Sequence, residues 1–396
     1  MSQMNRRQAL KLLAATGASG IIAGCGVGGD QDDVADASTA PVAIGLLIPQ
    51  AGPMKSIGDD LLRGFQLYLT MHGNQLGGHP VRLETAPEGD TPASAIAGLR
   101  ALFDRNVLAV SGIANPVVMN SDLRSAVRQA KVPVVGANGS PFNLQGEVFI
   151  WRTSYTGNEP GLAMGRYMAE NVDGRIVMVM PDGGSSQDVV LGFVDGFGSA
   201  SRLVREPIYT ADLPSPTRGS YDRAIRTIVN QGPEAVFAHF SGAAAVEFVR
   251  AYRAAGIRAP LYGTGFLTEG GAVAALGGSA AGIFTAMNYS ADLAFSANQI
   301  FASAFRKAHS VPPSAYAMAS FDAAHVLDRA IQLAGDDLTA QQVNLKLGQV
   351  GQIDSPRGLW QFNQSRTPQQ KWYLREVRRD GQINANVVMR ELTTLG

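Results

Sequence analysis

Residues 42–53 read VAIGLLIPQAGP, and they indicate the class of the fold. The run Val42–Ile48 is short and almost wholly apolar, which is typical of a strand buried on both faces of a parallel sheet. The chain continues into Ser56–Met71, where apolar residues fall on one stripe of a helix. A buried strand followed by an amphipathic helix predicts the first unit of an α/β fold.

The same alternation repeats along the chain. Further strand candidates, each short and nearly continuous in apolar character, are Val81–Ala86, Val107–Ser111, Val132–Val135, Arg175–Met180, Leu203–Tyr209, Ala235–Phe240 and Leu261–Gly263. Further helix candidates are Thr91–Arg105, Asn120–Ala130, Glu159–Asn171, Gln187–Ser199, Tyr221–Asn230 and Ala243–Ala255. Strand-helix-strand repeats of about 25–35 residues imply right-handed parallel units.

The alternation falls into two sets, which predicts two lobes. A strand over residues 148–154 separates the sets, and the second set begins at Arg175. The remaining elements expected are long helices over 294–308 and 316–334 and an antiparallel strand pair over 359–362 and 372–378. We therefore expect an α/β protein with two doubly wound parallel-sheet lobes, and a ligand cleft outside the carboxyl ends of their strands.

Composition excludes several classes of protein. The 396 residues are 45% hydrophobic and carry 33 basic and 33 acidic side chains. This apolar content is too high for a disordered chain, and a net charge of zero argues against a nucleic-acid partner. The single cysteine, Cys25, excludes an internal disulfide framework and a cysteine-rich zinc site.

The N-terminus has the pattern of an export signal. Basic residues up to Lys11 precede a mostly apolar stretch, residues 12–23, that is too short to span a bilayer. We interpret residues 1–24 as a signal peptide. Residues 5–11 read NRRQALK and resemble the twin-arginine export signal, with departures at Asn5 and Ala9, so ordinary Sec export stays open.

The end of this segment indicates a lipid anchor. Residues 22–25 read IAGC and resemble the bacterial lipobox, which implies cleavage before Cys25 and acylation of its thiol. Two acyl chains suffice for stable anchoring. Residues 25–40 would then be the lipidated cysteine and a flexible tether. The alternative is an uncleaved membrane helix with an idle cysteine.

The ordered set of motifs resembles one protein family. IGLLIPQAGP at 44–53 is followed by RGFQL at 63–67, VPVVGA at 132–137, FIWRTS at 149–154 and LYGT at 261–264. Together they resemble type I periplasmic binding proteins, and within them the leucine/isoleucine/valine-binding branch of ABC-transporter substrate-binding proteins. The match covers about residues 42–380.

The resemblance implies an organisation and a role. Lobe one would comprise residues 41–154 plus 290–352, and lobe two 156–288 plus 357–396, joined by three hinge crossovers. The protein would be exported, lipid-anchored on the periplasmic side and monomeric. It would capture a small solute, such as an amino acid or amide, between the lobes and deliver it to an ABC permease. The alternative is a ligand-sensing lipoprotein of the same fold that regulates an envelope enzyme or receptor kinase.

The resemblance also implies where ligand binds. In the amino-acid-binding branch, two lobe-one loops hold the ligand's carboxylate and ammonium with hydroxyls and backbone groups, and lobe two supplies aromatics and an acid. The matching positions in lobe one are Ile57, Asn115, Pro116, Asn138, Gly139 and Ser140. Those in lobe two are Ser186, Phe240, Gly265 and Phe266, with Tyr289 beside them.

The expected zwitterion site is incomplete. The acidic position falls at Gly265, and Glu269 is placed one helical turn away. A buried ammonium without a paired carboxylate costs several kcal/mol. Amides, hydroxyls and aromatic rings favour a weakly charged, partly apolar ligand.

Each of these residues has a structural alternative. Asn115 and Pro116 are turn formers, and Asn138 and Ser140 also cap segments. Phe240 and Phe266 are equally suited to a core position.

No catalytic or cofactor motif is present in the sequence. The five histidines lack paired metal-binding spacing, and neither a G-x-S-x-G elbow nor a phosphate-binding G-x-x-x-x-G-K occurs. We therefore expect no catalysis, no metal and no cofactor.

Overall fold

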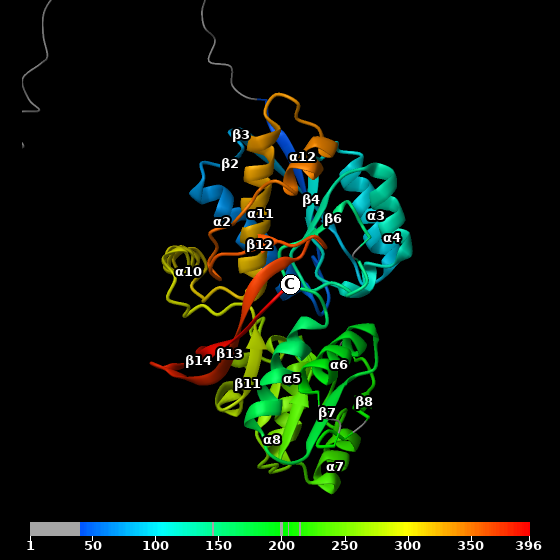
Figure 1. The fold of residues 1–396 in the computed structure, drawn as a ribbon, viewed down its shortest axis with the longest axis vertical. Helices are drawn as coiled ribbons and strands as arrows, with labels where there is room; N and C mark the ends of the chain where they lie inside the picture. Colours follow the sequence, from blue (N-terminus) through cyan, green and yellow to red (C-terminus); the bar gives the residue numbers. More distant parts are fainter. Residues whose placement is uncertain (1–39, 145, 199–200, 205, 214) are drawn as a thin grey trace, which may run out of the picture. The chain divides into compact units, whose positions relative to one another are not determined.

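We analysed a computed structural model, which describes residues 40–396 except 145, 199–200, 205 and 214. The predicted signal peptide and Cys25, with nearly all of the tether, lie outside the described residues. Figure 1 shows two lobes, each with its own sheet. Among the described residues, no helix has the length and apolar character needed to cross a bilayer.

The first lobe is built on a six-stranded sheet with the order β2-β3-β1-β4-β5-β6. The strands are β1 (Val42–Ile48), β2 (Gln75–Leu76), β3 (His79–Pro87), β4 (Ala109–Gly112), β5 (Val134–Gly136) and β6 (Ile150–Arg152). All neighbours pair in parallel except β2 with β3. The helices of this lobe are α2 (Lys55–Met71), α3 (Pro92–Phe103), η1 (Pro116–Val118), α4 (Ser121–Ala130), α10 (Ser296–His309), α11 (Ala315–Ala334) and α12 (Ala340–Leu347).

The second lobe has an eight-stranded sheet with the order β12-β13-β11-β10-β9-β7-β8, and β14 pairs with β13. The strands are β7 (Ile176–Pro181), β8 (Ile208–Thr210), β9 (Ala235–Ala238), β10 (Leu261–Thr264), β11 (Phe284–Met287), β12 (Gln361–Phe362), β13 (Pro368–Asp380) and β14 (Ile383–Leu395). The helices are α5 (Glu159–Asn171), α6 (Gly184–Phe197), α7 (Asp222–Gln231), α8 (Gly242–Ala254), η2 (Gly265–Thr268), α9 (Ala272–Leu276) and η3 (Gly277–Ala280).

The predicted fold class is confirmed, with mixed rather than purely parallel sheets. β13 runs antiparallel to β11, β12 and β14. Strand β14 was not predicted from the sequence, because it is half-buried and lacks the continuous apolar run of the central strands. Thr91 caps α3 as the sequence indicated, and its hydroxyl accepts from the Ser94 amide at 3.2 Å.

The segments that connect the lobes meet in a buried polar cluster. Gln370 Oε1 accepts from Asn288 Nδ2 at 2.8 Å and from Arg357 Nη1 at 2.6 Å, and Gln370 Nε2 donates to the Ser154 carbonyl at 2.5 Å. Ser154 follows β6, Asn288 follows β11 and Gln370 lies in β13. The exact residue boundaries of the lobes stay a prediction.

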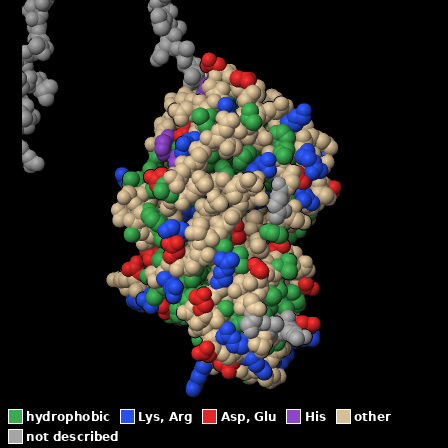
Figure 2. Space-filling model, viewed as in Figure 1, with side chains coloured by type: hydrophobic (Ala, Val, Ile, Leu, Met, Phe, Trp, Pro, Cys, Tyr) green, Lys and Arg blue, Asp and Glu red, His purple; other side chains and the backbone are tan. Residues whose placement is uncertain are grey.

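Residues 357–367, which the sequence analysis placed in lobe two, make contacts with first-lobe elements. The backbone amide of Arg152 in β6 donates to the Arg366 carbonyl at 3.0 Å, and Arg357 pairs with Asp322 of α11 at 3.0 Å. On the face in Figure 2, acidic and basic side chains are interspersed over both lobes.

Candidate functional site

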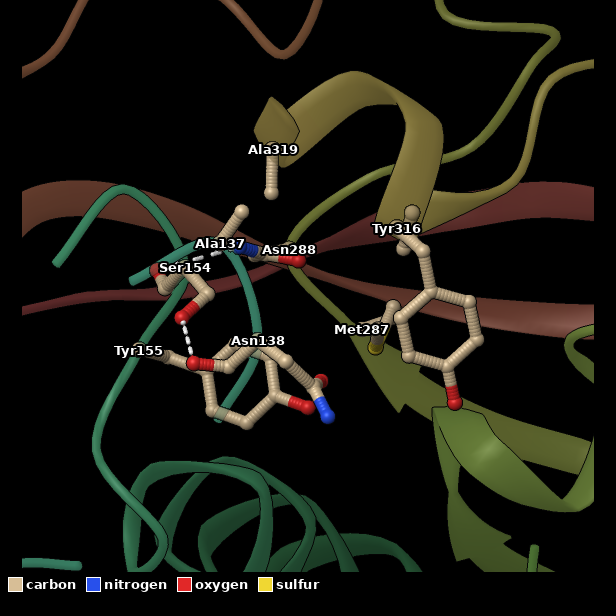
Figure 3. A pocket seen from close by; sticks show the side chains of 9 residues that line it. Ala137, Asn138, Ser154, Tyr155, Met287, Asn288, Tyr316 and Ala319 are labelled. Carbon is tan, nitrogen blue, oxygen red and sulfur yellow. Dashed lines mark hydrogen bonds between the residues drawn. The ribbon is translucent and has the colours of Figure 1, made fainter. Parts of the chain in front are cut away.

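A pocket lies where the two lobes meet (Figure 3). Its walls come from the end of β5, the segment after β6, the end of β11 and the first turns of α11. The lining residues are Ala137, Asn138, Ser154, Tyr155, Met287, Asn288, Ala315, Tyr316 and Ala319. The space between these side chains is small, about 180 Å³.

Aromatic rings from both lobes cluster beside this pocket. The Phe266 ring of η2 lies 5.8 Å from the Tyr155 ring and 6.1 Å from the Tyr316 ring, measured between centroids. Ring pairs at such distances pack favourably and prefer flat or edge-on apolar partners. Tyr316 is placed there because Ser314 caps α11, accepting from the Ala317 amide at 3.3 Å. The cluster offers apolar faces to a planar group.

Unpartnered polar atoms lie among these rings. Among the described residues, the buried atoms Asn138 Oδ1, Ser140 Oγ and Tyr155 OH have no hydrogen-bond partner. Leaving such a group unpaired costs about 1–3 kcal/mol, so a ligand that satisfies them gains that amount. The amide of Asn138 is oriented, because its Nδ2 donates to the Ala114 carbonyl. Its oxygen is therefore left free as an acceptor.

The acid Glu269, which contacts the pocket residue Ala315, is already engaged. Glu269 Oε1 lies 2.5 Å from Arg375 Nη1, and Glu269 Oε2 accepts from the Ala315 backbone amide at 3.0 Å. Both side chains of this ion pair are buried. The Glu269 carboxylate is thus satisfied without a ligand ammonium.

Position 265 has no space for an acid. A Cβ added to Gly265 would lie 2.3 Å from Met287 Sδ and 2.9 Å from Met287 Cβ. Real Cβ contacts are not that short, so a side chain here would displace Met287. Met287 fills the volume where the amino-acid-binding pattern expects a carboxylate.

Some predicted site residues do meet at this pocket. Asn138 lines it, and Gly139 lies beneath Tyr155, where an added Cβ would be 2.8 Å from a ring carbon. Ser140 forms a bridge with Thr156 beside them. Gly265 and Phe266 approach from the second lobe, in contact with Met287 and Tyr155 respectively.

Other predicted residues lie elsewhere. Phe240 stacks on Phe248 with a 4.4 Å centroid distance inside a hydrophobic core of the second lobe. Tyr289 donates its hydroxyl to Asn298 Oδ1 at 2.9 Å. Ile57 is a core residue of α2, and Ser186 is buried in the first turn of α6.

The loop with Asn115 and Pro116 is a helix start. Asn115 Oδ1 accepts from the Val117 amide at 3.0 Å, and Pro116 is the first residue of η1. These contacts are those expected if Asn115 and Pro116 act as turn formers, which is the structural alternative given for them above. Whether any of the predicted residues touches a ligand stays a prediction.

Sequence reasoning missed Tyr155, Tyr316 and His239. His239 and Phe240 follow β9, which ends at Ala238. His239 Nδ1 lies 2.9 Å from Thr264 Oγ1, and the His239 ring lies 5.9 Å from that of Phe266. Burial lowers the pKa of His239 to about 4, so the ring is neutral at physiological pH.

The described residues include no cluster of three or more His, Cys, Asp or Glu side chains arranged to hold a metal ion. The candidate site is therefore built from rings, hydroxyls and one amide.

Two sheet lobes with a pocket between them at the carboxyl ends of their strands have the arrangement of two-lobed solute-binding proteins. Residues 41–382 match the model of the periplasmic binding protein family, and the chain belongs to that family. The predicted resemblance is confirmed.

Curated relatives agree with this assignment. The chain is 26% identical to Leu/Ile/Val-binding protein homolog 6 of Brucella melitensis over 351 residues, which cover 85% of this chain and 87% of the relative.

Solved structures share the fold. A solute-binding protein of an ABC transporter from R. palustris, in complex with benzoate, superposes with a TM-score of 0.79 at 27% identity over 88% of this chain and 96% of that one. The branched-chain amino acid transporter substrate-binding protein LivJ from Streptococcus pneumoniae, in complex with isoleucine, gives a TM-score of 0.78 at 16% identity over 88% and 99%. The chain is thus a periplasmic solute-binding protein of the kind that serves ABC transporters and binds small ligands.

Proposed function

We propose that this protein captures a small aromatic carboxylic acid, such as benzoate or a hydroxybenzoate, between its lobes and delivers it to an ABC permease. The observation that carries the ligand class is the pairing of Glu269 with Arg375, at 2.5 Å, beside an aromatic cluster. A zwitterionic amino acid would bring an ammonium group to a pocket whose neighbouring acid is occupied. An aromatic acid brings no such charge.

The polar groups have complementary roles in this proposal. The hydroxyls of Ser140 and Tyr155 donate to the ligand carboxylate, and the free Asn138 oxygen accepts from a hydroxyl of the ligand. The rings of Tyr155, Phe266 and Tyr316 pack on the aromatic body. The relative that is 27% identical and was solved with benzoate supports the same ligand class.

A thermal-shift screen tests the ligand. Purified protein is mixed with benzoate, 4-hydroxybenzoate, leucine and putrescine at graded concentrations. A ligand at about 100 times its Kd stabilises the folded state by about 2.7 kcal/mol. We expect the aromatic acids to raise the melting temperature and leucine to leave it unchanged. Stabilisation by leucine alone would reject the proposed ligand.

The export and the anchor belong to the same proposal. Residues 1–24 act as the signal peptide, and Cys25 carries the lipid that holds the protein on the periplasmic side of the membrane. Cell fractionation tests this: wild-type protein should remain with membranes, and Cys25→Ala should be released as soluble protein outside the cytoplasm. A Cys25→Ala protein that stays in membranes contradicts lipidation.

An uptake assay distinguishes delivery of the ligand to a permease from a ligand-sensing role. Cells lacking this protein should lose high-affinity uptake of radiolabelled benzoate and regain it with the wild-type gene. If the purified protein binds benzoate but cells lacking it take up benzoate normally, the sensing role is favoured instead.

A further inference from the structure

A fully buried acid, Glu88, lies behind the loop that follows β4. Glu88 comes directly after β3, and its side chain is 0% exposed. Glu88 Oε2 accepts from the Ala114 backbone amide at 2.8 Å, and Oε1 accepts from the Asn115 amide at 2.9 Å. One carboxylate therefore holds two successive amides of the loop.

The loop has the geometry of an anion cradle. Gly112 and Ile113 both have positive φ, at 101° and 61°. A β-branched residue in this region is strained and needs compensating contacts. The turn directs successive amides toward one point, as in backbone sites that bind anions. Here the protein's own carboxylate occupies that point.

The loop in turn orients the pocket. The Ala114 carbonyl accepts from Asn138 Nδ2, and this contact leaves Asn138 Oδ1 free at the pocket. Glu88 thus connects to the pocket through two steps, from carboxylate to Ala114 and from Ala114 to Asn138. Glu88 itself does not line the pocket.

We propose that Glu88 is a positioning residue for ligand binding, which fixes the 112–115 loop from behind and thereby aims the Asn138 amide at the ligand. The inference rests on the proposed function only for the identity of the probe. It also accounts for the site's chemistry: the loop amides are filled by Glu88, so the ligand carboxylate is bound by the hydroxyls of Ser140 and Tyr155 instead.

The ionisation of Glu88 makes the positioning role testable through the pH dependence of ligand affinity. Burial raises the pKa of Glu88 to about 7, and the amides of Ala114 and Asn115 act against that rise. Asp90 is the charged side chain that adds to it. The facing loop, residues 112–118, and the first turn of α3 carry no charged side chain. The carboxyl of Glu88 therefore titrates near neutral pH.

Affinity and stability should respond to this titration in opposite directions. Only the ionised carboxylate accepts from both amides, so ligand affinity should rise as pH increases through about 7. The folded-state pKa is raised, so the stability contributed by Glu88 is present below about pH 4 and lost as pH rises through about 7. A residue with a merely structural role would move both quantities together.

The experiment compares wild type with Glu88→Gln, using Glu84→Gln as the control. Glu84 lies in β3, four residues before Glu88, pairs with Arg105 at 2.9 Å and does not line the pocket. 4-Hydroxybenzoate affinity is measured by calorimetry between pH 6 and pH 8, because the hydroxyl of this ligand can donate to Asn138 Oδ1 and benzoate has no such donor. Glu88→Gln turns one acceptor into a donor, so we expect affinity about tenfold weaker and independent of pH, with Glu84→Gln unchanged.

A second readout needs no ligand. Hydrogen exchange at the Ala114 and Asn115 amides and at the Asn138 side chain, followed by NMR, should accelerate in ligand-free Glu88→Gln and not in Glu84→Gln. If wild type fails to bind 4-hydroxybenzoate, the proposed ligand is wrong and this exchange decides the role of Glu88. Unchanged exchange, or accelerated exchange with unchanged 4-hydroxybenzoate affinity, would overturn the positioning role.

Discussion

The Glu269 carboxylate contacts the Arg375 guanidinium at 2.5 Å within the second lobe and, with its other oxygen, accepts the Ala315 amide of the first lobe at 3.0 Å. Glu269 therefore links the lobes at the start of α11, one residue before Tyr316. A second acid of the same lobe makes a similar link: Asp188 Oδ2 accepts from the Phe142 amide at 3.1 Å. Two carboxylates of the second lobe thus accept from backbone amides of the first.

Glu269→Gln should destabilise the protein by about 3 kcal/mol, because removing one partner of a buried pair leaves the other charge uncompensated. Urea unfolding measures the change. Glu391→Gln is the control: its pair with Lys371 is at 2.7 Å but both side chains are 45% exposed, so the expected loss is under about 1 kcal/mol. Equal losses for the two variants would contradict the role assigned to Glu269.

Tyr316→Leu should weaken benzoate binding about tenfold, because it removes a ring that packs beside Phe266, and should cost about 1–2 kcal/mol of stability because this ring is buried. Phe240→Leu provides the contrast. Phe240 stacks in the second-lobe core, so its substitution should lower the free energy of unfolding by about 1–2 kcal/mol and leave affinity unchanged. The reverse pattern would place the ligand next to Phe240.

Gly265→Ala should cost about 1–3 kcal/mol of stability, since its new methyl group would overlap Met287. Met287→Ala should restore part of this loss when the two substitutions are combined. The interaction free energy from a double-mutant cycle in urea measures the coupling. Additive effects would show that Met287 does not fill the space beside position 265.

Glu159→Gln should stabilise the protein at alkaline pH relative to wild type. Glu159 is buried at the start of α5, and burial raises its pKa to about 8. Because the folded-state pKa is raised, the stability that Glu159 contributes is present below about pH 4 and lost as pH rises through about 8. A glutamine at this position does not ionise, so its variant keeps that stability at high pH.

Unfolding free energies at pH 5, 7 and 9 test this. The advantage of Glu159→Gln over wild type should grow with pH to a few kcal/mol. Glu170→Gln, exposed on the same helix, is the matched control and should follow wild type. Parallel curves for Glu159→Gln and wild type would contradict a raised pKa.

The strands and helices of the core were predictable because their burial repeats in the sequence. The expected strand Val42–Ile48 coincides with β1, and the expected helix Glu159–Asn171 coincides with α5. Both have strong periodic or continuous apolar patterns. The half-buried strand Ile383–Leu395 lacks that signal and was missed.

The candidate site was predictable only in part. Resemblance located Asn138, Ser140 and Phe266 at the ends of strands, where parallel sheets place ligands. It also selected Phe240, which lies in a hydrophobic core of the second lobe, and whether Phe240 contacts a ligand stays a prediction.

Tyr316 and Glu88 could not be found from sequence. Their roles depend on contacts between distant segments, such as the approach of Phe266 to Tyr316 and of Glu88 to Ala114. No local pattern encodes those contacts.

Calorimetric titration of the purified protein with benzoate and, separately, with isoleucine tests the central claim most directly. The engaged Glu269 and the unpartnered hydroxyls of Ser140 and Tyr155 predict saturable one-to-one binding of benzoate and no heat of binding from isoleucine. Saturable binding of isoleucine, with no binding of benzoate, would contradict it.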